Sequence, residues 1–248
     1  MDLSPGLAEI CGIHAGDGHL RKRGNKTELE IGGSIEEKDY YNNHIVSLFE
    51  KVFQINVNPR LYSKGTYGVI IMNRDVANVL NSMGFPYGKK SQIVTVPISI
   101  LDSKNKIFFS KFLRGLFDTD GHLGFRKFYG KGYSKFKRNF HNYPTIRLTT
   151  VSKELAKDVI TMLNFLEIRN FLYSYQPKNP RDSYVYCVII NGVEELEKWM
   201  KIIGSKNSVK LSRYLVWKKF GFCPTKLTLV QREDLLNEKL HINDVMSS

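Results

Sequence analysis

The sequence predicts an α+β protein made of two copies of one supersecondary unit. A short motif occurs twice, at residues 12–20 and 115–123, so the copies are 103 residues apart. Each copy ends an apolar, helix-like run and places an aspartate and a glycine at its exit. The same order of helical and strand-like hydrophobic periodicities follows both copies. A carboxylate duplicated in this way is typical of one site assembled from two halves.

The first half is expected to run helix, two strands, helix, two strands, helix. Ser4 and Pro5 fit the N-cap and first turn of the opening helix, and Gly18 follows its end. Leu29 and Ile31 alternate with polar residues, as in a half-buried strand. The expected helices are 5–15, 36–53 and 75–83, and the expected strands are 19–23, 27–34, 55–62 and 67–72.

The second half repeats this order, and Gly84 and Gly204 close equivalent helices. The expected helices are 106–118, 153–166 and 193–203, and the expected strands are 123–128, 145–150, 171–176 and 184–190. We therefore expect two pseudo-symmetric αββαββα repeats, in which antiparallel sheets carry helices on one face and leave the other wet. The expected bounds are 1–85 for the first repeat, 86–105 for a linker, 106–208 for the second repeat and 209–248 for a partly helical C-terminal extension.

The composition indicates a polyanionic partner. The 248 residues include 37 Lys and Arg against 24 Asp and Glu, a net charge of +13. Apolar stretches such as 93–101 are too short to span a membrane, and no secretory signal follows Met1. The three cysteines are scattered and form no Cys-x-x-Cys pair. We expect an intracellular protein in a reduced compartment (the cytoplasm, or an organelle if the host is eukaryotic) that makes no membrane contact.

The duplicated aspartates are Asp17 and Asp120, and both lie at the C-terminal end of an expected helix. The helix dipole disfavours a carboxylate there by roughly 0.3–1 kcal/mol. Small residues would let the two helices pack side by side: Ala8, Gly12, Ala15, Gly16 and Gly115. A divalent cation between the carboxylates would offset both penalties, and hard oxygen ligands suit Mg²⁺. A single Asp-Gly pair commonly just ends a helix, but its duplication in a basic chain favours a site.

Residues 113–121 resemble the signature of the LAGLIDADG homing endonucleases in their single-chain, two-repeat form. Residues 10–18 match more loosely, because His14 and Ala15 replace the usual aliphatic and acidic residues. The resemblance covers both motifs, their spacing and the repeat order, or about residues 4–220. It implies a pseudo-symmetric saddle with the motif helices at its centre and two antiparallel sheets in the DNA major groove.

The resemblance also implies site residues. Asp17 and Asp120 would be the metal-binding catalytic carboxylates, and the backbone carbonyls of Gly16 and Thr119 would be secondary metal ligands. The metal would be Mg²⁺, with Ca²⁺ or Mn²⁺ able to substitute. The family places a lysine after the last helix of each repeat, for which we choose Lys90 over Lys89 in the first half and Lys206 in the second. Ala15 means that the first half lacks the extra acid that Asp118 gives the second.

Basic residues interleaved with aromatic residues predict the DNA-binding surface. Residues 126–138 hold six basic residues and no acid. Some basic side chains would read base edges and others would hold phosphates, over a target of roughly 20 base pairs. The candidates are Arg21, Lys22, Arg23, Lys26, Arg60, Tyr62, Lys64, Arg126, Lys127, Lys131, Lys135, Lys137, Arg138, Arg147, Tyr175, Lys178, Arg181 and Tyr186.

The predicted function is site-specific double-strand cleavage of DNA by a monomer with internal pseudo-twofold symmetry. An RNA-binding intron maturase on the same scaffold would have the same features. A DNA-binding regulator that has lost catalysis is a third hypothesis, against which the retention of both carboxylates counts. We expect no intein-embedded form, because the sequence begins without a Cys or Ser junction and does not end in His-Asn.

Overall fold

A computed structural model describes residues 2–127, 140–179 and 181–245 of the chain. The first half contains α1 (Pro5–Ala15), β1 (Gly18–Arg23), β2 (Lys26–Ser34), α2 (Val46–Phe53), β3 (Arg60–Ser63), β4 (Thr66–Ile71) and α3 (Arg74–Ser82). A short helix, α4 (Ile98–Asp102), lies in the joining segment. The second half contains α5 (Lys106–Asp120), β5 (Gly121–Lys127), β6 (His141–Thr150), α6 (Lys153–Phe165), β7 (Phe171–Tyr175), β8 (Val185–Asn191) and α7 (Val193–Ile202). The last elements are α8 (Ser208–Phe220), α9 (Leu229–Leu236) and a 3₁₀ turn (Ile242–Val245).

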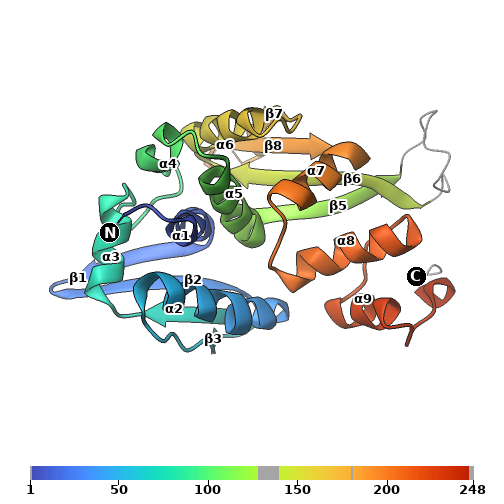
Figure 1. Ribbon diagram of the computed structural model, residues 1–248, viewed down its shortest axis with the longest axis horizontal. Helices are drawn as coiled ribbons and strands as arrows, with labels where there is room; N and C mark the ends of the chain where they lie inside the picture. The colour runs from blue at the N-terminus through green and yellow to red at the C-terminus, as the bar shows by residue number, and fades with distance from the viewer. Residues whose placement is uncertain (1, 128–139, 180, 246–248) are drawn as a thin grey trace.

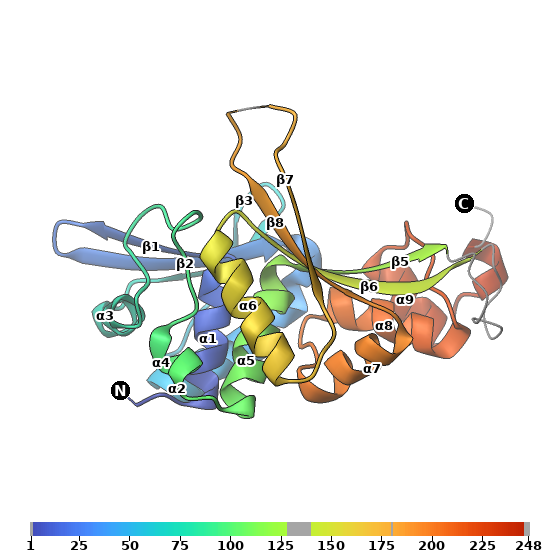
Figure 2. The same cartoon turned by 90° about the horizontal axis from the view of Figure 1, so that it is seen from above.

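The strands form two four-stranded antiparallel sheets with the same topology, β1-β2-β4-β3 and β5-β6-β8-β7. The sheets extend to either side of a central helix pair (Figure 1). Seen from above, the helices lie on one side of the sheets and the opposite side is open (Figure 2). The predicted α+β class with two pseudo-symmetric repeats is therefore confirmed.

The central pair is α1 and α5, which lie side by side (Figure 1). Glycines make this approach possible. A Cβ atom on Gly12 would lie 2.0 Å from the carbonyl oxygen of Phe112, and one on Gly115 would lie 2.3 Å from the carbonyl oxygen of Glu9. The two contacts are related by the internal twofold, since residues 9 and 112 and residues 12 and 115 are equally spaced. Backbone therefore rests on backbone at the seam, as the small residues of the motif predict.

Local sequence signals account for most element ends. The Ser4 hydroxyl accepts a hydrogen bond from the amide of Leu7 at 3.1 Å and caps α1, and the Asn105 side chain caps α5 at the amide of Ile107. Gly84 and Gly204 have positive φ, as helix-ending glycines require.

The expected helix at 36–53 differs in detail. It consists of a 3₁₀ turn at Ile35–Glu37, a π-helical turn at Tyr40–Ile45 and then α2. The wider π turn carries His44, whose ring contacts Glu9 on α1. Only the end of the expected strand at 55–62 pairs in the sheet, because β3 starts at Arg60.

The chain beyond α7 packs back onto both repeats. Arg232 of α9 is buried, and its guanidinium donates to the Ser212 hydroxyl and to the carbonyl oxygens of Leu227 and Val209. The amide of Leu229 donates to Glu36 of the first repeat. The C-terminal segment therefore ties α8 to the first repeat, and the repeat boundaries drawn from the sequence stay predictions.

Two further expectations concern membrane spans and the state of the cysteines. Within the described ranges, no helix is both long and apolar enough to cross a membrane. Cys11, Cys187 and Cys223 are all buried free thiols.

We predict that Gly115→Ala destabilises the fold by about 3 kcal/mol, because the new methyl group meets backbone atoms that cannot move independently. Gly124→Ala is the matched control, since the nearest atom to its new Cβ is the mobile end of the His122 side chain. Urea unfolding of both variants measures the difference. Equal stabilities would contradict the close helix seam.

Candidate active site

The two motif aspartates meet at the ends of the central helices. Asp17 follows the C-cap of α1 by one residue, and Asp120 is the last residue of α5. Their side chains are within hydrogen-bonding reach of each other. The backbone of Gly16 also lies against side chains of α5, since a Cβ on Gly16 would lie 2.2 Å from the Thr119 hydroxyl and 3.4 Å from the Asp120 carboxyl carbon. The structure therefore brings together the two carboxylates that the sequence singles out.

This proximity perturbs Asp17. Burial and the neighbouring Asp120 carboxylate raise the pKa of Asp17 to about 7, and the charge of Glu37 acts in the same direction. Two like charges at the negative ends of two helix dipoles form an unfavourable arrangement for the isolated protein. A cation placed between the carboxylates would relieve it.

A buried lysine caps each of these helix ends. The ammonium group of Lys90 donates to the carbonyl oxygens of Ala15 at 2.8 Å and Gly16 at 2.7 Å. The ammonium group of Lys210 donates to the carbonyl oxygens of Asp118 at 2.7 Å and Thr119 at 2.8 Å. The two pairs of acceptors occupy equivalent motif positions, so the two lysines are pseudo-symmetric. Their charge compensates the carbonyl ends of both helices.

Burial lowers the pKa of both lysines, while the Asp17 and Asp120 carboxylates act to raise it. For Lys210 the charges of Asp118 and Glu37 also raise it. In both cases desolvation prevails, and the pKa lies below the usual lysine value.

The structure places Lys206, the lysine chosen for the second half, outside this arrangement. Lys206 is exposed, and only its backbone amide reaches the motif, where it donates to Asp118 at 2.8 Å. The chain turns at 204–207 and begins α8 at Ser208, so Lys210 in the first turn of that helix points at α5. The sequence does contain a signal that identifies Lys210, namely its spacing from the glycine that closes the preceding helix. Lys90 lies six residues after Gly84, and Lys210 lies six residues after Gly204.

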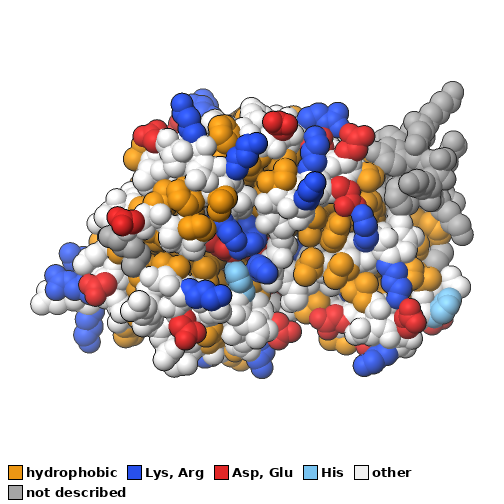
Figure 3. Space-filling model, in the orientation of Figure 1, with side chains coloured by type: hydrophobic (Ala, Val, Ile, Leu, Met, Phe, Trp, Pro, Cys, Tyr) orange, Lys and Arg blue, Asp and Glu red, His pale blue; other side chains and the backbone are white. Residues whose placement is uncertain are grey.

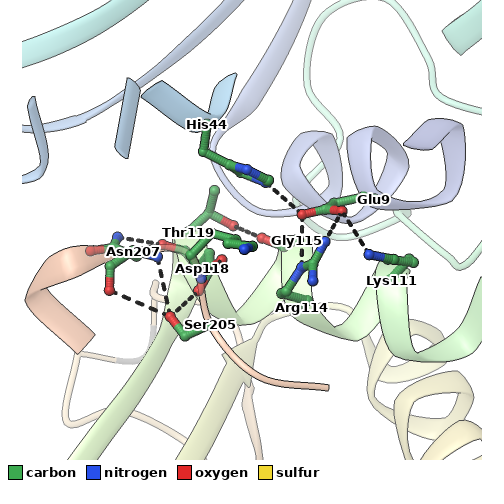
Figure 4. A network of polar contacts seen from close by, with 10 residues as sticks. Glu9, His44, Lys111, Arg114, Gly115, Asp118, Thr119, Ser205 and Asn207 are labelled. Atoms are coloured by element: carbon green, nitrogen blue, oxygen red, sulfur yellow. Dashed lines mark hydrogen bonds and ion pairs between the residues drawn. The ribbon is translucent and has the colours of Figure 1, made fainter. Parts of the chain in front are cut away.

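Asp118 faces away from the aspartate pair. Its carboxylate accepts a hydrogen bond from the Ser205 hydroxyl at 2.5 Å (Figure 4). It also accepts one from the Lys206 amide at 2.8 Å. Burial raises its pKa, although these two hydrogen bonds act to lower it. The extra acid of the second motif therefore fixes the turn that leads into α8.

Asn207 links the two repeats beside this turn. Its side-chain amide donates to the carbonyl oxygen of Asp118 at 2.8 Å and to Glu37 of the first repeat at 2.6 Å. Its side-chain oxygen caps α8 at the amide of Val209. Sequence analysis missed both Asn207 and Glu37, since neither stands in a duplicated motif.

The residues present fit a divalent cation of the Mg²⁺ type. The donors at the seam are two carboxylates, which are hard oxygen ligands. Among the described residues no cluster of three or more His, Cys, Asp or Glu side chains could hold a metal ion. The protein would thus supply few ligands and leave the other positions to solvent and substrate oxygens. The carbonyls of Gly16 and Thr119, also expected as ligands, accept hydrogen bonds from Lys90 and Lys210 and offer one remaining lone pair each.

A second polar network crosses the seam one to two helical turns away. Glu9 of α1 is 1% exposed and forms ion pairs with Arg114 of α5 and with His44 at 2.7 Å; Lys111 lies 3.9 Å away (Figure 4). Burial raises the pKa of Glu9, but the hydrogen bonds and charges of His44 and Arg114 outweigh it and bring the pKa to about 2. This network joins the repeats without touching the aspartate pair.

Most of the described DNA-binding candidates lie on the sheets or their tips. Four arginines alternate with buried strand residues and thus lie on the open side: Arg21, Arg23, Arg126 and Arg147. Arg60 lies on the same side, because it is in register with Gly68, which alternates with the core residues of β4. Tyr62 lies across Gly32 on that side, since a Cβ there would meet its hydroxyl at 1.7 Å. Tyr175 is exposed on β7. Lys26 and Lys127 are exposed near hairpin ends, Lys64 lies at the β3–β4 turn, and Lys178 and Arg181 lie on the β7–β8 connection that projects in Figure 2.

Two candidates lie elsewhere. Tyr186 packs against the hydrophobic core on the helix side of β8, and Lys22 lies over the Tyr87 ring of the linker, 5.7 Å from its centroid. Each of these residues is a direct sequence neighbour of residues on the open side, so its own side chain lies on the opposite face of the sheet. Lys131, Lys135, Lys137 and Arg138 lie outside the described residues.

The helix side of the molecule carries charges of both signs. In the view of Figure 3, Lys and Arg side chains are interspersed with Asp and Glu and with apolar side chains. Within the part of the chain that the structure describes, this face therefore carries no large patch made of basic side chains alone.

The fold and the seam site define a two-repeat α+β protein with one shared carboxylate pair. Residues 109–204 match the family model described as LAGLIDADG-like domain. A structure of I-DmoI in complex with DNA and Mn superposes with a TM-score of 0.54, covering 82% of this chain and 98% of that one at 17% identity. The meganuclease I-SmaMI bound to uncleaveable DNA gives 0.53, covering 99% and 97% at 12% identity. Residues 109–204 therefore carry a LAGLIDADG-like domain, and the whole chain shares the fold of these two structures.

Sequence relatives are much longer proteins. The chain is 28% identical over 215 residues to the replication factor C small subunit of Methanocaldococcus jannaschii, covering 86% of this chain and 10% of that protein. It is 27% identical over 212 residues to the tRNA-splicing ligase RtcB of Methanopyrus kandleri, covering 80% and 20%. The chain thus spans a tenth to a fifth of these relatives, and their names describe far more than the matched segment.

The Glu9 network predicts a defined acid sensitivity. Because the pKa of Glu9 is about 2 in the folded protein and ordinarily 4.5, Glu9 stabilises the fold fully above pH 4.5 and loses this contribution as the pH falls toward 2. Glu9→Gln should cost about 3 kcal/mol at pH 6, since it leaves Arg114 without a carboxylate. The difference from wild type should shrink at pH 3. Chemical unfolding at both pH values tests this, and a pH-independent difference would contradict the ionic role of Glu9.

Proposed function

We propose that this chain is a site-specific DNA endonuclease that makes a double-strand break in a long, asymmetric target with Mg²⁺ as its cofactor. The carrying observation is the contact between Asp17 and Asp120 at two adjoining helix ends, with Lys90 and Lys210 beside them. Carboxylates for a divalent cation and ammonium groups beside it are the groups that phosphodiester hydrolysis needs. The match of residues 109–204 to a LAGLIDADG-like domain and the +13 charge support the same substrate class.

Asp17 and Asp120 would hold the metal. When bound, a divalent cation stabilises the negative charge that develops on the phosphate oxygens. Structures of I-DmoI with DNA and Mn or Ca give precedent for divalent ions with this fold. Mn²⁺ and Ca²⁺ are therefore natural substitutes to compare with Mg²⁺.

Lys90 and Lys210 would place fixed positive charge next to the scissile phosphates. Both ammonium groups are tethered to helix carbonyls, so they need no reorganisation when charge develops. A pKa held below the usual lysine value also makes Lys90, which directs two of its three N–H groups to helix carbonyls, a better proton donor to a leaving oxygen. Lys210 directs all three to the carbonyls of Phe117, Asp118 and Thr119 and would act through its charge. One lysine per repeat matches one cut per DNA strand.

The open faces of the two sheets would grip the duplex, one half-site each. Two sheets within one chain allow a monomer to read a target whose halves differ. An RNA-binding maturase would use the same basic surface. It would not need the aspartate pair, because it would not cleave DNA.

Asp17→Asn and Asp120→Asn should each lower the rate of double-strand cleavage by at least about 100-fold, because each removes a metal-binding charge. DNA affinity should remain near that of wild type. The assay is cleavage of a selected target with and without Mg²⁺, together with a gel-shift measurement of binding.

Asp118→Asn is the matched control for this pair. Asp118 contacts Ser205 and Lys206 rather than the aspartates, so its variant should lose stability while the metal dependence of cleavage is unchanged. Normal cutting by either Asp17→Asn or Asp120→Asn would refute the assignment.

Lys210→Met should reduce the cleavage rate by about 100-fold, the usual loss when one charged donor to a transition state is removed. Lys206→Met, four residues away and exposed, should cut at the wild-type rate. Single-turnover kinetics compare the two, with thermal unfolding as a check on folding. The reverse order of effects would restore Lys206 as the lysine of the second half.

A further inference from the structure

The open faces of the two sheets have different chemistry at equivalent positions. In the first sheet, His19 on β1 lies opposite Glu30 on β2, and Glu30 lies opposite Ile70 on β4. In the second sheet, His122 on β5 lies opposite Arg147 on β6, and Arg147 lies opposite Ile189 on β8. A glutamate in one row is thus replaced by an arginine in the other, and the difference extends across both faces.

The first face is dominated by a polar cluster. The Arg21 guanidinium forms ion pairs with Glu28 at 2.9 Å and Glu30 at 2.8 Å. The Tyr62 hydroxyl lies within hydrogen-bonding reach of Glu30. Arg60 of β3 lies in register with Gly68 on the adjoining strand. This face therefore offers charged donors and acceptors that suit polar base edges.

The second face is apolar along its edge strand. No aspartate or glutamate occurs in β5, β6, β7 or β8 within their described bounds. Phe171, Tyr173 and Tyr175 alternate along β7 on the open side and are 48%, 54% and 41% exposed. Phe171 lies in register with Ile189 and then with Arg147, and Tyr173 lies in register with Cys187 and then with Thr149. Three large aromatic side chains thus border a surface whose charged groups are basic.

An exposed aromatic strip on a basic face fits one feature of the DNA major groove. Thymine alone among the four bases carries an apolar group there, its C5-methyl, which apolar side chains contact. A nearby arginine such as Arg147 suits guanine in the same groove. The first face, by contrast, offers carboxylates that suit the exocyclic amine of cytosine.

We propose that the half-site bound by the second sheet contains thymines whose C5-methyl groups pack against Phe171 and Tyr173. The inference rests on the proposed DNA-binding function and specifies its substrate. The half-site bound by the first sheet is read through the Arg21–Glu28–Glu30 cluster and does not depend on methyl groups. The target is thus asymmetric in base chemistry as well as in sequence.

The test begins with selection of bound duplexes from a random DNA library, using the wild-type chain without divalent cations so that the DNA stays intact. A Phe171→Ala/Tyr173→Ala variant is then selected in the same way. We expect wild type to enrich thymine at two or more positions of one half-site and the variant to lose that enrichment there alone. Loss in both halves or in neither would overturn the inference.

A second measurement needs no variant. Replacing the selected thymines of that half by uracil removes only their methyl groups, and each loss should weaken wild-type binding about fourfold, as expected for one buried methyl group. The same replacement in the other half should change nothing. Leu172→Ala is the matched control, because Leu172 neighbours both aromatics on β7 but points to the opposite face, in register with Val188. It should retain the uracil penalty.

The outcomes separate the two claims. Unchanged affinity for uracil-containing DNA, with a well-defined selected site, overturns the thymine contact and leaves the endonuclease proposal standing. Selection that yields no preferred sequence overturns the proposed function and the inference with it.

Discussion

The close approach of α1 and α5 is the constraint from which the site follows. Gly12 and Gly115 let the two helix backbones touch at twofold-related points. Helices that cross this closely and end together must bring their C-termini to one place, and with them Asp17 and Asp120. Larger residues at either glycine would separate the helices and move the carboxylates out of reach of one cation. The packing of small residues thus sets the chemistry of the acidic ones.

Such a seam concentrates unfavourable electrostatics, and the surrounding residues compensate for it in two ways. Next to the carboxylates, Lys90 and Lys210 place positive charge on the helix-end carbonyls. Deeper in the seam, Glu9 pairs with Arg114 of the other repeat and with His44 of its own repeat. The first arrangement leaves Asp17 and Asp120 with their mutual repulsion, because both ammonium groups are directed to carbonyls. Because the protein itself does not neutralise this repulsion, a divalent cation bound between the two carboxylates would be stabilised by both of them.

The sequence predicted those parts of the structure that occur in both repeats. The motif duplication located Asp17 and Asp120, and the shared periodicities gave the two sheets and their order. Parts that depend on one copy were missed. Asn207 donates to Asp118 and to Glu37, which lies 170 residues before it in the sequence, and no spacing rule connects such positions. Lys206 was chosen by its proximity to the closing glycine, whereas the lysine that caps α5, Lys210, shares with Lys90 an equal spacing from the closing glycine of its repeat. The π turn that brings His44 to Glu9 depends on tertiary packing, which local propensity does not register.

The two repeats have diverged unevenly, and the physical reason lies in how many neighbours each position must satisfy. A residue at the seam faces its own repeat and the other one, so Gly12, Gly115, Asp17 and Asp120 have matching roles in both halves. A residue on an open sheet face is restricted by its cross-strand partners and by the ligand alone. Glu30 and Arg147 can therefore differ in sign at equivalent positions without disturbing either core. An arrangement of this kind lets the surface that reads a ligand change while the seam that acts on it stays fixed.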